Sequence, residues 1–293
     1  MGYGDYSFST RSDRATKKGY STKSAKDIFA EKNLNKDMNP KGVIIRESRD
    51  SDEHPESVAI VLGVDVTGTM GTVPHYLVKD GLPTIVDKVM ENGLKDPQIL
   101  FMGVGDHRCD KAPLQISQFE SSDELMDKWL TTVYLEGGGG RNGGESYFLP
   151  WYFASRHTSI DCFEKRGKKG ILITIGDEPT HPSVTKEQLK KIMGKSFSES
   201  PRVVDESFEQ WDDDFVEIDE QEYEKIDSYT AEELLYDAQK TYDVYHIHVA
   251  QTRSGKIEST IEKWDNLLGD NLIVAETRED VPDAISKIIN SNR

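Results

Sequence analysis

The sequence that decides the fold is Val58-Ala59-Ile60-Val61-Leu62-Gly63-Val64, followed at once by Asp65-Val66-Thr67-Gly68-Thr69-Met70-Gly71. An unbroken apolar run of this length predicts a strand that is buried on both faces, as in the middle of a parallel sheet. The polar turn after it places carboxylate and hydroxyl oxygens at the carboxyl end of the strand. Because open α/β sheets bind ligands at that edge, the same stretch also indicates where a functional site should lie.

Strands and helices alternate along the rest of the chain. Further strands are predicted at about 98–104, 114–119, 170–176, 243–249 and 272–274. Helices are predicted at about 73–92, 122–131, 145–157 and 230–241, and a closing helix places Val281, Ile285, Ile288 and Ile289 on one face. The strand at 114–119 is expected to form a hairpin with the one at 98–104. The pattern predicts an α/β fold of the Rossmann-like, doubly wound type, with a mostly parallel central sheet, one antiparallel edge strand and helices on both faces.

Two segments depart from this alternation. Residues 1–56 are rich in Ser, Lys, Arg, Asp and Gly, and we interpret them as an N-terminal extension that is partly ordered or bound by a partner. An acidic insertion at about 196–228 interrupts the domain predicted at 57–293. Between Glu199 and Asp227 it holds thirteen Asp or Glu residues against one Arg and one Lys. Such charge runs are usually solvated surface, although the aromatic residues within this one also suit an interaction element.

Composition and charge narrow the class of protein. A formal net charge of −17 argues against binding to nucleic acid or to an anionic membrane, because phosphate groups would repel the chain. Two Cys residues exclude a disulfide framework and favour a reducing compartment. No signal peptide is visible, and no apolar run approaches the roughly 20 residues that span a bilayer. We therefore expect a cytoplasmic protein that does not enter the membrane.

Oxygen-bearing side chains are expected to converge at the carboxyl edge of the sheet. Asp65, Thr67 and Thr69 alternate in one tight loop, so their oxygens can face one point. Asp177 ends another buried strand in the same way, and it shares a crevice with Asp65 if the two strands are neighbours. Carboxylate and hydroxyl oxygens are hard ligands that suit Mg²⁺, Mn²⁺ or Ca²⁺. The sequence therefore predicts a divalent-metal site at this edge.

The motif Asp65-x-Thr67-x-Thr69 after an apolar first strand resembles the metal ion-dependent adhesion site of von Willebrand factor A (VWA) domains. Asp177, in Gly176-Asp177-Glu178-Pro179, resembles the distal Asp of that family. The resemblance covers about residues 57–293, with the acidic insertion as a departure, and points to the intracellular bacterial type of VWA protein. It implies a bound divalent metal, Mg²⁺ before Mn²⁺ or Ca²⁺. Asp65, Thr67 and Thr69 would hold it directly or through water, and Asp177 through water.

The third part of the family's metal site has no direct match in this chain. The family supplies a Thr, or sometimes an Asp, from the loop before the third helix, but no Thr lies between Gly137 and Glu145. Asn142 or Glu145 would take that place, with Asn142 favoured. A carboxylate there would make the metal's surroundings more anionic and weaken its need for an acid from a partner.

The resemblance also implies a function. It predicts a metal-dependent protein–protein interaction module, not an enzyme, in which an Asp or Glu of a protein partner completes the coordination of the metal. The expected partner-binding rim consists of Asp106, His107, Arg141 and Glu178. Intracellular members of the family often work with MoxR-type AAA+ ATPases as adaptors or assembly factors. The sequence has no ATPase motif of its own, which fits an ATPase that acts in trans.

Two other functions stay open. The first is a metal-dependent hydrolase or phosphoryl-transfer enzyme in which Asp65, Asp177 and Glu145 hold the metal. Against it, no base or nucleophile stands beside the site with a recognisable spacing. The second is a structural component of a multi-protein assembly related to defence or to phages.

Two motifs have a simpler interpretation than a site. Gly138-x-Gly140-x-x-Gly143 formally matches the dinucleotide fingerprint. It lies midway through the predicted sheet, and not in the first strand–helix unit where that motif belongs. His246 and His248 lie on one face of a predicted strand, where a packed or rim position is favoured over metal binding.

Overall fold

The computed structural model describes residues 13–14, 16–20, 22–70, 73–77, 94, 96–136, 143–202, 227–252, 254 and 256–292, and for Thr69 and Asp123 the backbone alone. Several predicted features therefore lie outside the described residues. They are Arg141 and Asn142 of the glycine-rich loop, residues 203–226 of the acidic insertion, and most of the helix predicted at 73–92.

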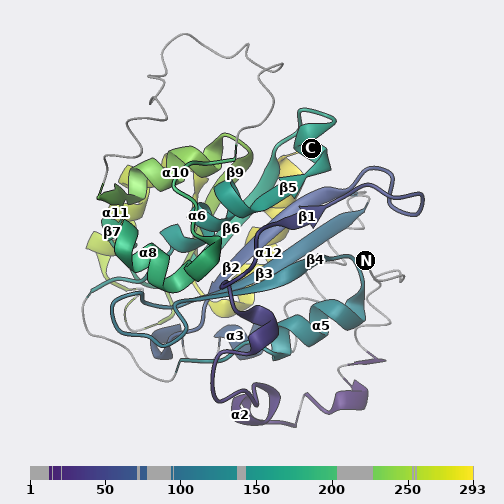
Figure 1. The fold of residues 1–293 in the computed structure, drawn as a ribbon. Helices are drawn as coiled ribbons and strands as arrows, with labels where there is room; N and C mark the ends of the chain where they lie inside the picture. Colours follow the sequence, from purple (N-terminus) through teal and green to yellow (C-terminus); the bar gives the residue numbers. More distant parts are fainter. Residues whose placement is uncertain are drawn as a thin grey trace.

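A six-stranded sheet forms the centre of the molecule (Figure 1). Its strands are β2 (Val58–Asp65), β3 (Pro97–Val104), β4 (Leu114–Glu120), β6 (Gly170–Gly176), β9 (Tyr242–Val249) and β10 (Leu272–Ala275). They lie in the order β10-β9-β6-β2-β3-β4, and β4, at the edge, is the one antiparallel strand among them. The predicted Rossmann-like α/β sheet with an antiparallel edge strand is confirmed.

The register of the parallel strands brings their carboxyl ends to one edge. Asp65 of β2 lies opposite Val104 of β3, and Val64 lies opposite Ile175 of β6. Gly176 of β6 in turn lies opposite His248 of β9. The loops that follow β2, β3 and β6 therefore start side by side, which meets the condition for Asp65 and Asp177 to share one crevice.

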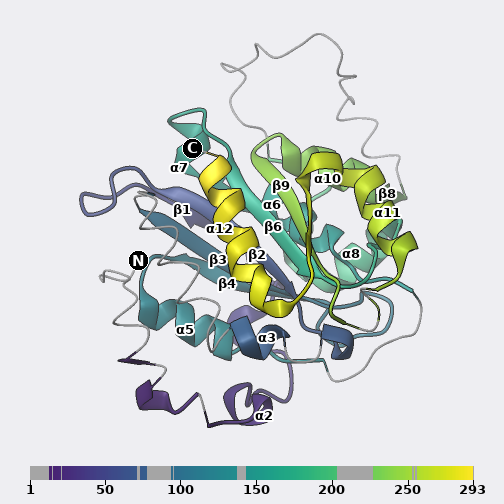
Figure 2. The ribbon, with the colours of Figure 1, turned by 180° about the vertical axis from the view of Figure 1, so that it is seen from behind.

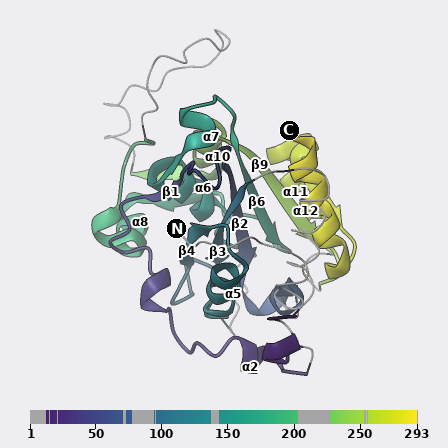
Figure 3. The same cartoon turned by 90° about the vertical axis from the view of Figure 1, so that its right-hand side faces the viewer.

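Side chains of the buried strands alternate between two hydrophobic cores. In β2, Ile60, Leu62 and Val64 face one core, while Ala59 and Val61 face the other. Helices α5 (Asp123–Thr131) and α12 (Val281–Ser291) cover the first face (Figure 2). The second face is covered by α6 (Phe148–His157), α8 (Lys186–Met193), α10 (Ala231–Gln239) and α11 (Glu258–Leu268). Figure 3 shows the sheet between α6 and α12, so helices lie on both faces as predicted.

Helix α6 begins three residues later than the sequence predicts. Glu145 forms a short parallel bridge with Thr180, in which its N–H donates to the Pro179 carbonyl at 3.0 Å and its carbonyl accepts from the His181 N–H at 2.9 Å. Because these backbone groups are used in an extended pairing, the helix cannot include Glu145. The result is that Glu145 stays in the loop, at the edge where the strands end.

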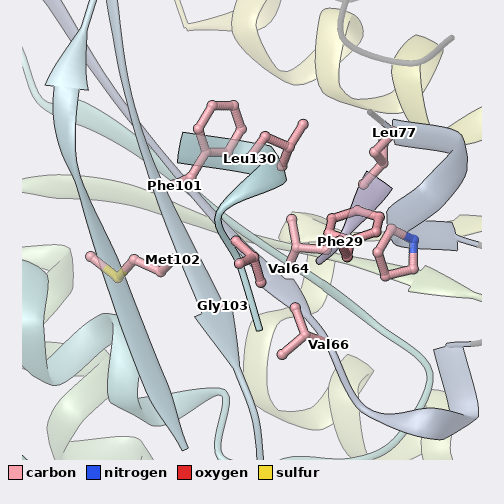
Figure 4. A pocket seen from close by; sticks show the side chains of 10 residues that line it. Phe29, Val64, Val66, Leu77, Phe101, Met102, Gly103 and Leu130 are labelled. Carbon is pink, nitrogen blue, oxygen red and sulfur yellow. The ribbon is translucent and has the colours of Figure 1, made fainter. Parts of the chain in front are cut away.

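The part of residues 1–56 that the structure describes packs against the domain. Strand β1 (Arg46–Ser48) pairs in parallel with β5 (Thr158–Ile160) in a separate two-stranded sheet, and Nε of Arg46 donates to the Ser117 carbonyl of β4 at 2.8 Å. Phe29, just after the short helix α2 (Ala25–Ile28), reaches a small apolar pocket whose walls include Val64 and Leu77 (Figure 4). The described part of this segment thus contributes to both cores, with Phe29 in the first and Val43 in the second.

Several short elements connect the main ones. They are α3 (Val73–Tyr76), α7 (Asp161–Glu164), the antiparallel pair β7 (Ser183–Thr185) and β8 (Ser228–Thr230), and the 3₁₀ turns η1 (Lys36–Met38), η2 (Gly68–Met70), η4 (Gly194–Ser196), η6 (Gly269–Asn271) and η7 (Arg278–Asp280). Within the described residues, no helix combines the length and apolar character needed to cross a membrane.

Candidate functional site

Backbone hydrogen bonds join three loops at the carboxyl edge of the sheet. The loop after β3 runs from Gly105 to Asp110, and the loop after β6 runs from Asp177 to His181. The segment 143–146 lies between them, because the Ser146 N–H donates to the Gly105 carbonyl at 3.3 Å while Glu145 pairs with the loop after β6. The loop after β2, which begins at Asp65, borders the same place.

Asp65 is fully buried and is held in one orientation. Its Oδ1 accepts hydrogen bonds from the backbone N–H and the hydroxyl of Thr67, at 2.8 and 2.6 Å, so the alternating motif forms the tight loop that the sequence predicts. Its Oδ2 accepts from the hydroxyl of Tyr147 at 2.6 Å. Burial, and then the charge of Asp177, raise the pKa of Asp65 to about 7.

Glu145 is the most strongly perturbed acid of the cluster. The residue is 3% exposed, and its Oε2 has no hydrogen-bond partner among the described residues. Burial, then the charge of Asp65 and then that of Asp106, raise the pKa of Glu145 to about 10. Within the described part of the chain, neither Glu145 nor Asp65 forms an ion pair with a Lys or Arg. Acidic groups are therefore crowded together here with no Lys or Arg ion pair to Asp65 or Glu145 among the described residues, which is why their pKa values rise.

Tyr147 is a member of this cluster that the sequence did not indicate. A Cβ at Gly176 would overlap its phenol ring, so the glycine at the end of β6 gives the ring its place. The hydroxyl sits among the charges of Asp65, Asp177 and Glu145, which with burial raise the pKa of Tyr147 far above its usual value. The signal in the sequence is its position two residues after Glu145, in the segment that opens α6.

A second group of polar side chains lies beside the first. Asp106 Oδ1 is 3.0 Å from Nε2 of His181 and 3.8 Å from Nδ1 of His107. His107 Nδ1 is also 2.7 Å from the hydroxyl of Ser146. Burial, and then the neighbouring His181, lower the pKa of His107 to about 4. Asp106 and His107 were predicted as part of the partner-binding rim; in the structure their side chains are 1% exposed, and their role towards a partner stays a prediction.

The remaining predicted residues are partly accounted for. Glu178 is half-buried; its carboxylate accepts from the hydroxyl of Ser254 at 3.2 Å, and its carbonyl accepts from Nε1 of Trp264 at 3.0 Å. Asp177 is fully buried next to Asp65. Arg141, Asn142 and the side chain of Thr69 lie outside the described residues, so their roles stay predictions.

His246 and His248 occupy packed positions. Both are fully buried, and the ring of His246 stacks on Trp264 with centroids 3.6 Å apart. Nδ1 of His246 is 2.8 Å from the hydroxyl of Thr174 on the neighbouring strand. The interpretation of the pair as packed residues is confirmed.

The donor set of the first cluster fits a divalent cation. Carboxylates of Asp65, Asp177 and Glu145 and the hydroxyl of Thr67 are hard oxygen donors, the type that Mg²⁺, Mn²⁺ and Ca²⁺ prefer. The buried Oε2 of Glu145 without a partner, and the raised pKa values of two neighbouring acids, are both relieved by a positive charge. The chemistry of these donors therefore suits a metal of this class, although in this structure the carboxylates of Asp65, Asp177 and Glu145 do not each place an oxygen within 4.8 Å of the others.

Comparison with protein-family models gives no match for this chain, and comparison with curated protein sequences gives none. Among solved structures, the pilus adhesin SpaC from Lactobacillus rhamnosus GG in its open conformation is similar over 84% of this chain, at 12% sequence identity and a TM-score of 0.47. This chain covers 31% of that adhesin.

Two further solved structures show the same kind of similarity. An aerotolerance-related membrane protein from Bacteroides fragilis NCTC 9343, with multiple mutations to serines, matches 80% of this chain and 100% of its own length, at 9% identity and a TM-score of 0.43. A von Willebrand factor type A structure from Catenulispora acidiphila matches 81% of this chain and 43% of its own, at 8% identity and a TM-score of 0.39. The structures that this chain is similar to thus include a VWA structure.

Proposed function

We propose that this protein is a metal-dependent protein–protein interaction module. Asp65, Thr67, Asp177 and Glu145 would hold a divalent cation, with Mg²⁺ the first candidate, and an Asp or Glu of a protein partner would bind at that cation. The observation that carries the proposal is the Oε2 of Glu145, which is buried at the carboxyl edge of the sheet beside the buried Asp65 and has no hydrogen-bond partner among the residues that the structure describes. An isolated buried carboxylate is costly, so its presence favours a ligand that supplies positive charge.

Thr69 and Glu145 complete the ligand set in different ways. Thr69 is proposed from the sequence motif alone. Glu145 is preferred over Asn142 as the third part of the site, because it is held next to Asp65 by its backbone pairing with the loop after β6. The charge of its carboxylate strengthens attraction for the cation, while the hydroxyl donors leave part of the cation's charge unneutralised for the partner's acid.

The proposed partner follows from two arguments, the chemistry of the contact and the resemblance to VWA domains. The charge-assisted contact needs an exposed Asp or Glu, and the surrounding loops would give specificity. Among such partners, a MoxR-type AAA+ ATPase is the specific candidate that the VWA resemblance implies. The protein would then act as an adaptor or assembly factor and not as an enzyme.

The metal site is tested by calorimetric titration of Mg²⁺ and Mn²⁺ into the wild type, Asp65→Asn and Asp96→Asn. The control is matched, because Asp96 lies at the opposite edge of the sheet, and its positive φ of 54° is one that Asn also tolerates. We expect binding to wild type and Asp96→Asn and none to Asp65→Asn. Metal at 100 times its Kd would stabilise the fold by about 2.7 kcal/mol. Equal binding by all three would place the ion elsewhere.

The partner is tested by gel filtration of the chain with a purified MoxR-type ATPase from the same organism. We expect co-elution in Mg²⁺ that is lost in EDTA and with Asp65→Asn. A complex that ignores both EDTA and the substitution would instead support a structural component of an assembly. Turnover of a phosphoester panel in Mg²⁺ or Mn²⁺, abolished by Asp65→Asn, would support the enzymatic alternative.

A further inference from the structure

Asp106, His107 and His181 form a compact group of metal-type donors outside the Asp65 cluster. One ligand atom from each lies within 4.8 Å of the others, and no comparable group of three or more His, Cys, Asp or Glu was found among the described residues. Asp106 and His107 come from the loop after β3, and His181 comes from the loop after β6. The segment 143–146, paired with both loops, holds them together.

The geometry points to a second metal site, in which Asp106, His107 and His181 bind a transition-metal ion of the Zn²⁺ class. In a tetrahedral zinc site the bonds are about 2.0–2.1 Å long, which places neighbouring ligand atoms about 3.3 Å apart. The two measured separations here, 3.0 Å from Asp106 Oδ1 to His181 Nε2 and 3.8 Å from Asp106 Oδ1 to His107 Nδ1, lie on either side of that value.

The three side chains are already positioned by their surroundings. The side chains of Asp106 and His107 are 1% exposed and that of His181 is 3% exposed. The backbone N–H of His107 donates to the hydroxyl of Ser146 at 2.9 Å, which holds the residue in place. The same hydroxyl is 2.7 Å from Nδ1 of His107, a contact that a metal bound at Nδ1 would replace. Asp106 Oδ1 also accepts from the N–H of Arg108 at 2.9 Å. Such supporting contacts are what metal-binding residues need in order to hold their orientation.

The chemistry of this site differs from that of the Asp65 cluster. Two imidazole nitrogens and one carboxylate favour Zn²⁺ and related transition metals, whereas the all-oxygen set around Asp65 favours Mg²⁺ or Mn²⁺. Cys109 stands beside the second site, with its sulfur 3.2 Å from Asp106 Oδ2, but it is exposed and is not one of the three converging donors. The two sites should therefore respond to different metals and to different substitutions.

The alternative is a buried His–Asp hydrogen bond that serves packing alone. The chain contains a suitable comparison in His54, whose Nδ1 is also 3.0 Å from a carboxylate, that of Asp96, at the amino edge of the sheet. That pair has no second histidine converging on the same carboxylate. If the proposed zinc site exists, substitution in the His181–Asp106 pair should weaken zinc binding and substitution in the His54–Asp96 pair should not. A general affinity of His–Asp pairs for metal would make both substitutions act alike.

The test is a zinc titration of the full chain, stripped of metal by a chelator, in competition with a chromophoric zinc indicator. We expect one Zn²⁺ per wild-type chain and an affinity about 100-fold or more weaker in His181→Gln and in Asp106→Asn. His54→Gln and Cys109→Ser should keep wild-type affinity. Substitution by Co²⁺ should give the intense visible bands of a tetrahedral site in the wild type, and His107→Gln should change them.

Controls keep this test separate from that of the proposed function. Asp65→Asn should lose Mg²⁺ and Mn²⁺ but keep Zn²⁺, so either site can fail without the other. Thermal unfolding checks each variant, and if His181→Gln does not fold, the zinc affinity of His107→Gln decides instead. The proposal is overturned if the folded wild type binds no Zn²⁺, or if the His181 and His107 variants bind it as tightly as His54→Gln. Loss of zinc in Cys109→Ser alone would overturn it as well.

Discussion

Acidic residues at the two edges of the central sheet differ in whether basic side chains pair with them. At the amino edge, Arg49 forms ion pairs with Asp161 at 2.7 Å and Glu164 at 2.8 Å. Arg166 pairs there with Asp50 at 2.6 Å. At the carboxyl edge, the described acids lie next to one another, and Asp65 and Glu145 have no such partner.

The pKa values follow the same division. At the amino edge, burial acts to raise the pKa of Asp161, but hydrogen bonds from Lys165 and Arg49 outweigh it and the pKa falls below its usual value. At the carboxyl edge, burial and like charges act together, and the pKa of Asp65 rises to about 7. Lys and Arg side chains thus neutralise the acids at the amino edge. Among the described residues, the acids at the carboxyl edge lack that compensation, which supports the proposal that a cation binds there.

The largest expected effect is on the pH dependence of stability. A carboxyl group whose pKa is raised on folding keeps its proton longer in the folded state, so the folded chain binds more protons and its free energy of unfolding falls as pH rises. For Asp65, the pH range of this loss runs from the usual pKa of 3.8 to the folded-state pKa of about 7. The raised pKa of Glu145 extends the range towards pH 10. We expect the metal-free protein to lose up to about 1.4 kcal/mol per pH unit for each such proton.

Urea unfolding in a chelating buffer between pH 5 and pH 8 measures this effect. The amino edge does not interfere, because acids with lowered pKa values contribute stability that is lost only as the pH falls below their usual values. Asp65→Asn should flatten the profile, and saturating Mg²⁺ should flatten it in the wild type. A metal-free wild type that becomes more stable from pH 5 to pH 8 would contradict the contrast between the edges.

The next effect tests the amino edge by removing its central cation. Arg49→Ala leaves the buried carboxylate of Asp161 with the exposed Lys165 and the backbone N–H of Asp50 as partners, and should lower the free energy of unfolding by about 2–3 kcal/mol. The value is below that of a fully buried ion pair because the side chain of Arg49 is 28% exposed. Chemical denaturation at pH 7 measures it. Lys190→Ala is the control, since its exposed pair with Glu199 should contribute under about 0.5 kcal/mol; equal losses would show that the network has no special role.

The sequence predicts the strands of the central sheet well, but it predicts the side-chain contacts at the amino and carboxyl edges only in part. Unbroken apolar runs identify the central strands β2 and β6, because a strand buried on both faces must be apolar along its length, and the alternation of strands and helices places the others around them. The network around Arg49 was missed because residues 1–56 have little periodicity, and strand β1 is formed by pairing with a distant segment. Such pairing leaves no local signal.

The candidate site shows the same limit. Asp65 and Asp177 are predictable because each directly follows a buried strand, and the order of the strands then brings them together. Tyr147 and His181 have no motif of their own, and their places depend on Gly176 and on the bridge between Glu145 and Thr180. Both side chains lie within two residues of segments that the sequence did mark, so residues flanking a predicted ligand are the ones to inspect.

The smallest of these effects compares one neutralised glutamate at each edge. Because the raised pKa of Glu145 keeps this carboxyl protonated in the folded state at pH 7, folding must take up a proton there. Glu145→Gln needs no such proton, so the metal-free protein should become more stable by about 1–2 kcal/mol at pH 7. The same change should weaken Mn²⁺ binding about 10-fold or more, because a charged ligand is lost. Glu164→Gln at the amino edge should have the opposite sign, with a loss of about 1 kcal/mol, because its carboxylate accepts hydrogen bonds from Arg49 and Ser159. Chemical denaturation and Mn²⁺ titration of the two variants measure both effects. If Glu145→Gln destabilised the metal-free protein as Glu164→Gln does, the carboxyl group of Glu145 would stabilise the fold without a metal. That result would contradict the proposal that the acids of the carboxyl edge bind a cation.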